Sequence, residues 1–121
     1  MLRAELVHDV TDADTAIALG SGDVAVLATP RLVAWCEEAT VLAIASALDE
    51  TQTTVGVRVE LDHLAATPVG GTVRIMAEVV ETEGSRYTFS VEASDEHAIV
   101  GNGRVVRVRV DRAKFLARLR R

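Results

Sequence analysis

The second half of the chain alternates between apolar and polar residues with a period of two. This pattern, rich in Val, Ile and Thr, is typical of β-strands that bury one face. It predicts four strands, at residues 53–61, 72–81, 86–94 and 99–110. Glycine, proline and acidic residues interrupt the alternation between successive strands, at residues 67–71, 83–85 and 95–97. We therefore expect these strands to follow one another as an antiparallel meander.

The first half of the chain follows a different pattern. Residues 2–8 alternate loosely and predict an edge strand, and residues 11–23 predict a loop with a short helical turn. Residues 30–48 predict a long helix, with Thr29 as its N-cap and a proline in its first turn. A short helix over residues 112–119 is expected to end the chain.

The predicted long helix is apolar around nearly its whole circumference. The residues responsible are Leu32, Val33, Ala34, Val41, Leu42, Ile44 and Ala45. A helix of this kind must be buried on most sides, and a curved antiparallel sheet wrapped around it would achieve that. We therefore predict an α+β domain with the hotdog fold. Such a sheet has open edges, which predict pairing with a second copy of the chain.

Length and composition narrow the possible functions. The 121 residues are enough for a single domain over residues 1–121, and the low aromatic content of 3% predicts a core of Val, Ala, Leu and Ile. A net charge of −5 argues against a dedicated nucleic-acid binder. We interpret the arginine-rich segment 104–121 as a solvated strand face followed by a surface helix.

The numbers of cysteines and histidines and the hydropathy of the chain argue against further classes of protein. The only cysteine, Cys36, can form neither an internal disulfide nor a thiolate zinc site, and the three histidines lack ligand spacing. We expect no metal and no cofactor. Because the chain has no apolar segment of signal-peptide or membrane-span length, we predict a cytoplasmic protein without a membrane partner.

Three residues are candidates for chemistry. Glu37 lies on an apolar stripe of the long helix, where a carboxylate must be neutral, paired or facing a cavity, unless it reaches water at the helix edge. His63 lies where a strand ends and the chain must turn, so it faces either a cleft or water. Thr29 opens the helix, where free amides suit a developing oxyanion.

The spacing of these candidates has a structural consequence. Thr29 and Glu37 are eight residues apart, which is about 12 Å along a helix. They cannot touch within one subunit if the helix is continuous. They could share a site if Thr29 came from one chain and Glu37 from its two-fold partner, which predicts two sites per dimer.

Three segments resemble a known enzyme family. They are LATPRLVAWCEEATVLAI, TTVGVRVELDHLAATPVGGTV and FSVEASDEHAIVGNGRVVRVRVDRAKF. The chain resembles the fluoroacetyl-coenzyme A thioesterase family of hotdog enzymes from about Val24 to Phe115. That family uses a threonine, a glutamate and a histidine, which match Thr29, Glu37 and His63.

The resemblance also implies where substrate binds. The small residues after His63, namely Ala65, Ala66 and Gly70, would leave space for the acyl thioester. The phosphates of coenzyme A (CoA) also need basic partners, for which the chain offers Arg104 and, as alternatives, Arg58, Arg74, Arg107 and Arg109. Relatives often carry a histidine after the Gly-x-Gly of the last strand, where this chain has Arg104 and Val105. Residues 11–26 also lack the aromatic lid of the fluoroacetyl-specific enzyme, so a general small or medium acyl group is expected.

The implied reaction is hydrolysis of an acyl-CoA thioester to the free acid and CoA. Glu37 would act as general base or as nucleophile, His63 would assist proton transfer, and Thr29 would polarise the carbonyl. The expected partners are acyl-CoA and a second copy of the chain, in a homodimer that could pair into a tetramer. The alternatives are a non-catalytic hotdog protein that binds acyl-CoA or another small ligand, and a hotdog dehydratase or hydratase acting on enoyl thioesters.

Overall fold

The computed structural model describes residues 2–120. Its strands are β1 (Arg3–Asp9), β2 (Gln52–His63), β3 (Thr72–Glu83), β4 (Arg86–Ser94) and β5 (Ile99–Asp111). Its α-helices are α1 (Ala16–Leu19), α2 (Thr29–Ile44) and α3 (Arg112–Ala117), and short 3-10 turns cover Asp12–Asp14 and Ala45–Ala47. All predicted elements are present, and the strand bounds agree with the sequence pattern to within about two residues.

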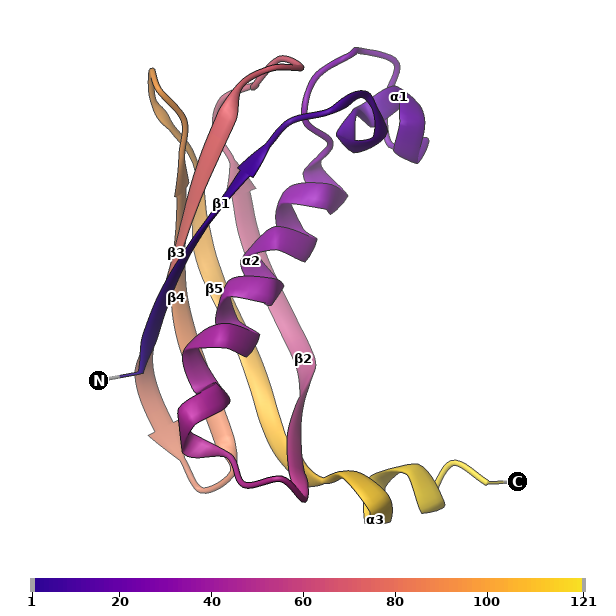
Figure 1. Ribbon diagram of the computed structural model, residues 1–121, viewed down its shortest axis with the longest axis vertical. Helices are drawn as coiled ribbons and strands as arrows, with labels where there is room; N and C mark the ends of the chain where they lie inside the picture. The colour runs from indigo at the N-terminus through magenta and orange to yellow at the C-terminus, as the bar shows by residue number, and fades with distance from the viewer. Residues whose placement is uncertain (1, 121) are drawn as a thin grey trace.

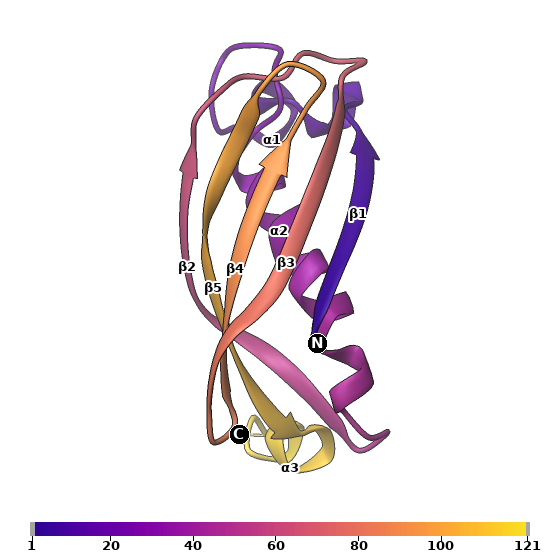
Figure 2. The same cartoon turned by 90° about the vertical axis from the view of Figure 1, so that its left-hand side faces the viewer.

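One curved sheet carries all five strands in the order β1-β3-β4-β5-β2, and every neighbouring pair is antiparallel. The sheet bends around α2, which lies along its concave face (Figures 1 and 2). This is the predicted hotdog arrangement. The prediction of a single meander is correct for β3, β4 and β5 but wrong for β2. The chain leaves β2 at one edge, crosses the end of the sheet and enters β3, so that β2 pairs with β5 instead.

The core lies between α2 and the concave face of the sheet. Leu32, Cys36, Ala39 and Ile44 of α2 are fully buried, as is Phe89 of β4. Apart from Trp35, Phe89 and Tyr87, the buried cluster consists of aliphatic residues and Cys36, in agreement with the low aromatic content. Alternate residues of each strand point into this cluster, which explains the period-two pattern.

The long helix differs from its prediction in two ways. It ends at Ile44, where a 3-10 turn over Ala45–Ala47 begins, and not at residue 48. It is also not buried on most sides, because the five strands cover only one side of it (Figure 1). Val41 and Leu42 are 46% and 51% exposed. The apolar side that faces away from the sheet is therefore available for another partner.

Four smaller features complete the description of the fold. β2 forms one edge of the sheet, and Val57 on it is 49% exposed. Gly70 adopts a left-handed conformation, with φ of 92°, in the turn before β3, which an L-residue rarely accepts. α3 ends at Ala117, two residues earlier than predicted. None of the helices in residues 2–120 is long and apolar enough to cross a membrane.

Candidate active site

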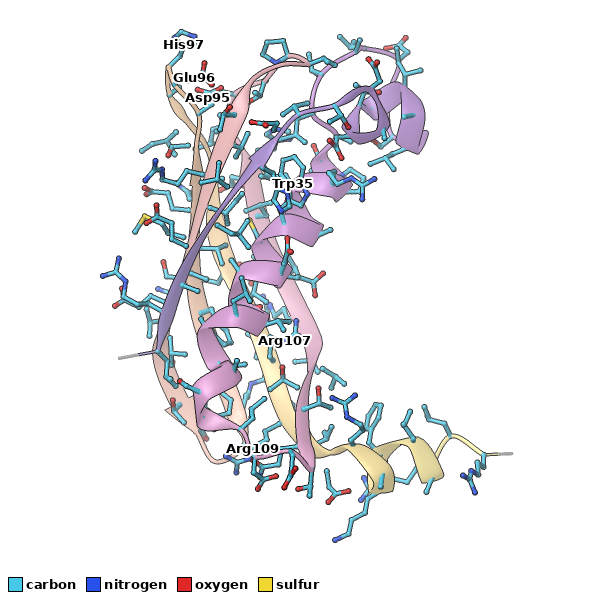
Figure 3. All side chains as sticks on the ribbon, in the orientation of Figure 1. Trp35, Asp95, Glu96, His97, Arg107 and Arg109 are labelled. Carbon is cyan, nitrogen blue, oxygen red and sulfur yellow. The ribbon has the colours of Figure 1, made fainter. Side chains whose placement is uncertain are left out.

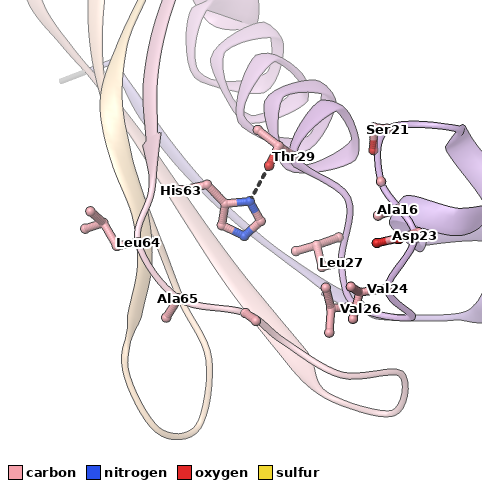
Figure 4. Close-up of a pocket in the computed structure, with 12 residues that line it drawn as sticks. Ala16, Ser21, Asp23, Val24, Val26, Leu27, Thr29, His63, Leu64 and Ala65 are labelled. Carbon is pink, nitrogen blue, oxygen red and sulfur yellow. Dashed lines mark hydrogen bonds between the residues drawn. The ribbon is translucent and has the colours of Figure 1, made fainter.

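His63 and Thr29 meet at one end of the molecule. His63 is the last residue of β2, and Thr29 is the first residue of α2. The Thr29 hydroxyl and His63 Nδ1 are 2.7 Å apart, which is a short hydrogen bond (Figure 4). Both side chains line a pocket of about 370 Å³. The sequence placed His63 where a strand ends, and the structure turns its ring toward this cavity.

The second ring nitrogen of His63 differs from the first in its contacts. Nε2 is buried and has no hydrogen-bond partner among residues 2–120. Burial lowers the pKa of His63 below its ordinary value of 6.5, and contact with the backbone of Ala65 opposes this only in part. The imidazole is therefore neutral at pH 7. If Thr29 donates to Nδ1, Nε2 carries the proton, and if Nδ1 donates to Thr29, Nε2 can accept one.

Thr29 does not cap the helix, contrary to the prediction. Ala28 is the N-cap residue, and no side chain caps that end. Thr29 already lies within the helix. Its hydroxyl is hydrogen-bonded to the imidazole of His63 and not to the amides of the first turn. The amides at this end of α2 consequently have no side-chain acceptor, and the hydroxyl is exposed to the pocket.

Glu37 lies elsewhere on α2, beside a buried arginine. Arg107 of β5 has a side chain that is 9% exposed, and its Nη1 is 3.5 Å from Glu37 Oε2. The same guanidinium donates to the hydroxyl and the carbonyl oxygen of Thr54, at 2.8 and 3.1 Å. Figure 3 shows Arg107 between α2 and the sheet. Glu37 is thus paired and partly open, with 36% of its side chain exposed.

Arg107 stays charged in this position. Burial lowers its pKa and the carboxylate of Glu37 opposes that shift, but a guanidinium remains protonated in proteins. A glycine makes room for the pair, because a Cβ at Gly56 would lie 2.7 Å from Glu37 Oε2. The sequence analysis missed this role of Arg107. A glycine inside the strand pattern of β2 was the available signal, since it marks close approach of another group.

The chain does not bring its three candidate residues together. Thr29 lies beside His63, whereas Glu37, two helical turns further along α2, lies beside Arg107. The separation of about 12 Å expected from the helix rise holds, because α2 is continuous between these residues. One subunit therefore contains two parts of a possible site rather than one complete site.

The other predicted residues divide into two groups. Ala65 and Ala66 line the pocket beside His63, while Gly70 and Arg104 do not. Arg104 borders a separate hollow of about 220 Å³ between β2, β4 and β5. The roles of Gly70 and Arg104 in substrate binding stay predictions. The pocket wall also includes Asp23, from the segment before α2, which the sequence analysis did not single out (Figure 4).

Glu38, the neighbour of Glu37, has a different environment. Its Oε1 is 2.7 Å from His8 Nε2, and the His8 ring stacks on Trp35 with centroids 4.5 Å apart. This contact lies against β1, whereas Glu37 faces β2 and β5. Glu38 is therefore a control for any test of Glu37.

Comparison with known proteins identifies the family of this chain. The family model for the fluoroacetyl-CoA-specific thioesterase matches residues 10–113. The fluoroacetyl-CoA thioesterase of Streptantibioticus cattleyicolor is 36% identical over 95 residues, which are 78% of this chain and 68% of that protein. A solved structure of the fluoroacetyl-CoA thioesterase FlK superposes with a TM-score of 0.91 at 30% identity, covering 97% of this chain and 91% of that one.

A thioesterase superfamily member from Thermus thermophilus is similar as well. It is 32% identical, with a TM-score of 0.88, and the match covers 95% of this chain and 85% of that one. The match to the family extends over most of the chain, from before α2 to α3, and includes both parts of the site. The chain belongs to the fluoroacetyl-CoA-specific thioesterase family.

Proposed function

We propose that this chain hydrolyses a small or medium acyl-CoA thioester with Thr29, His63 and Glu37. The observation that carries the proposal is the His63–Thr29 pair, which lines the pocket and leaves Nε2 without a partner among residues 2–120. A neutral imidazole held by a hydroxyl at one nitrogen can move a proton at the other. Family membership supports the reaction class, and the chemistry of these side chains supports the assignment of roles.

In the proposed reaction, water adds its oxygen to the thioester carbonyl carbon and the carbon–sulfur bond breaks. Glu37 takes a proton from that water, or attacks the carbonyl itself and is released by water in a second step. In either route His63, neutral before the reaction, accepts a proton released from this water at Nε2 and passes it to the CoA thiolate. Thr29 and the uncapped amides of α2 stabilise the carbonyl oxygen as it becomes negative. The products are a carboxylic acid and CoA.

The acyl group is expected to differ from that of the relative named for fluoroacetyl-CoA. In this chain the pocket wall before α2 contains Asp23, Val24 and Val26, and residues 11–26 contain no aromatic side chain. A carboxylate and small aliphatic side chains do not form an aromatic cover over the acyl group. This supports a general small or medium acyl group.

The complete site is proposed to form between two copies of the chain. Glu37 is too far from Thr29 and His63 to act with them inside one subunit, whereas the free edge of β2 offers a surface for pairing. A two-fold axis beside this edge would bring Glu37 of one chain to the Thr29–His63 pair of the other, twice per dimer. Pairing of dimers into tetramers and a cytoplasmic location stay predictions.

The test is release of free thiol from a panel of acyl-CoA esters by the wild type, Glu37→Gln and Glu38→Gln. We expect kcat to fall on the order of a hundredfold or more in Glu37→Gln, because a general base or nucleophile is lost. Glu38→Gln is isosteric and changes the adjacent residue, so it should remain within about threefold of wild type. Similar losses in both variants would contradict the role of Glu37. Tight binding of acyl-CoA without turnover by the wild type would indicate a binding protein instead.

A further inference from the structure

Another hollow lies near the C-terminal end of α2. Its volume is about 340 Å³. One wall is apolar and comes from the end of α2 and the turn after it, with Val41, Ile44 and Leu48. Thr53 and Thr54 at the start of β2 form the opposite wall. The charged and amide side chains of Asp49, Glu50, Gln52 and Arg112 also border the hollow.

This hollow adjoins the Glu37–Arg107 pair. Val41 is one helical turn beyond Glu37, on the same stripe of α2. On the other wall, Thr54 accepts two hydrogen bonds from Arg107, which in turn contacts Glu37. An unbranched chain attached to a carbonyl carbon at Glu37 can therefore continue along α2 into the hollow.

The chemistry of the walls favours an apolar occupant. Val41 is 46% exposed, whereas Ile44, the next residue on the same stripe of α2, is fully buried. The hydroxyl and carbonyl of Thr54 already accept from Arg107, so an alkyl chain beside them leaves no hydrogen bond unmade. Asp49, Glu50 and Arg112, which also border the hollow, are exposed. A hydrocarbon chain inside the hollow would cover apolar surface.

We propose that this hollow binds the acyl chain of the substrate. It would make the protein a thioesterase for medium-length, unbranched acyl groups. The proposal rests on the proposed function and names the substrate class of the same site. From Glu37, Val41 lies about 6 Å and Ile44 about 10 Å further along the helix. An extended chain advances about 1.2 Å per bond, so the hollow matches acyl groups of about six to ten carbons.

A second copy of the chain is the other occupant that could cover Val41. The charged side chains that border the hollow favour the acyl chain, because a close protein contact would have to desolvate them. The edge of β2 proposed for pairing lies further along that strand, around Val57. The two occupants give different outcomes in the experiment below.

The experiment compares kcat/KM for straight-chain acyl-CoA esters from two to twelve carbons in the wild type, Val41→Trp, Leu48→Trp and Leu42→Trp. The wild type should prefer six to ten carbons, because each buried methylene improves binding by about threefold to fourfold. Val41→Trp narrows the hollow near its entrance and should lower the ratio of octanoyl to acetyl turnover at least tenfold. Leu48→Trp narrows its far end and should affect only the longest esters.

Leu42→Trp is the matched control, since Leu42 is 51% exposed, adjacent to Val41 and not part of the hollow. It should keep the wild-type profile. A wild-type optimum at two carbons, or an unchanged octanoyl-to-acetyl ratio in Val41→Trp, would overturn the proposal. Equal loss on all esters in Val41→Trp, together with a change from dimer to monomer in gel filtration, would assign Val41 to the subunit contact and also overturn it.

Failure of the proposed function is recognised separately. If the wild type hydrolyses no ester, calorimetric titration with octanoyl-CoA and acetyl-CoA still tests the hollow. Octanoyl-CoA should then bind at least tenfold more tightly than acetyl-CoA to the wild type, and Val41→Trp should abolish the difference. Equal affinities of the wild type for the two esters would show that the acyl chain does not bind in this hollow.

Discussion

The two ring nitrogens of His63 differ, because one is hydrogen-bonded and the other has no partner among residues 2–120. The Thr29 hydroxyl lies 2.7 Å from Nδ1, and Nε2 is buried without a partner in residues 2–120. Desolvation disfavours the imidazolium, so the pKa of His63 is lowered. A histidine in this state is neutral under physiological conditions and can accept or donate a proton during turnover.

The lowered pKa of His63 predicts the pH dependence of activity. In the proposed reaction neutral His63 is the active form, so log kcat/KM should be flat above about pH 6.5 and fall only below it, as His63 becomes protonated. The measurement is kcat/KM for one acyl-CoA ester between pH 5 and 8.5. A midpoint for the acid limb above 6.5 would contradict the burial of His63 in the working enzyme.

The same shift predicts the direction of a change in stability. The unfolded chain binds a proton at His63 more readily than the folded chain, so the stability contributed at this site is present above about pH 6.5 and is lost as the pH falls through the folded pKa. Urea unfolding at pH 7.5 and 5.5 measures this loss. His63→Gln should show a smaller loss than the wild type between these two values.

Single residues also show where sequence reasoning stops. The candidates Glu37 and His63 could be chosen from pattern alone, because a carboxylate on an apolar stripe and a histidine at a strand end stand out. Arg107 did not stand out, since it is one of several arginines in a strand. Its importance depends on register: it lies opposite Gly56, whose missing side chain leaves space for the Glu37 carboxylate.

At the scale of elements, β2 and β5 are joined by an unusually close contact. A Cβ at Gly103 of β5 would lie 1.9 Å from the carbonyl oxygen of Glu60 on β2. That oxygen is part of the backbone and cannot rotate away. Gly56 in the same ladder would place a Cβ near Glu37 Oε2, which is the end of a flexible side chain. The two glycines are therefore needed for different reasons.

Alanine substitutions at these glycines should separate stability from activity. Gly103→Ala should lower the free energy of unfolding by at least about 2 kcal/mol, because β2 must move away from β5. Gly56→Ala should change it by less than about 1 kcal/mol but lower kcat at least about tenfold, because the Glu37 carboxylate is displaced. Urea unfolding and thiol release measure the two effects. Equal stability losses in the two variants would show that Gly56 serves the ladder and not Glu37.

The bounds of the strands could be predicted more reliably than which strands pair with one another. Alternation fixed the bounds of β4 at Arg86–Ser94 and gave the other strands to within about two residues, because burial of one face acts on every second residue. Alternation says nothing about which strand lies beside which. The place of β2 next to β5 depends on the connection over residues 64–71, which crosses the end of the sheet. The meander prediction failed there for that reason.

At the scale of the whole molecule, one chain holds the two parts of the proposed site far apart. The Thr29–His63 pair lies at the start of α2, and the Glu37–Arg107 pair lies two turns further on. The side of α2 that faces away from the sheet is open, and so is the edge of β2 (Figures 1 and 2). The sequence predicted this separation correctly, because helix rise alone determines it.

Mixing two inactive variants tests the proposed assembly directly. Glu37→Gln and His63→Gln should each be inactive as homodimers, since every site lacks one group. In a mixed dimer, Glu37 of the His63→Gln chain meets His63 of the Glu37→Gln chain, so one site is intact and the other lacks both groups. Random pairing makes half of the dimers mixed, so an equal mixture should recover about one quarter of wild-type activity. Unfolding and refolding the two variants together before measuring thiol release gives that pairing, and the same mixture without refolding is its control. If each subunit used only its own Glu37 and His63, no mixed dimer would contain an intact site, and activity would stay at the level of the separate variants.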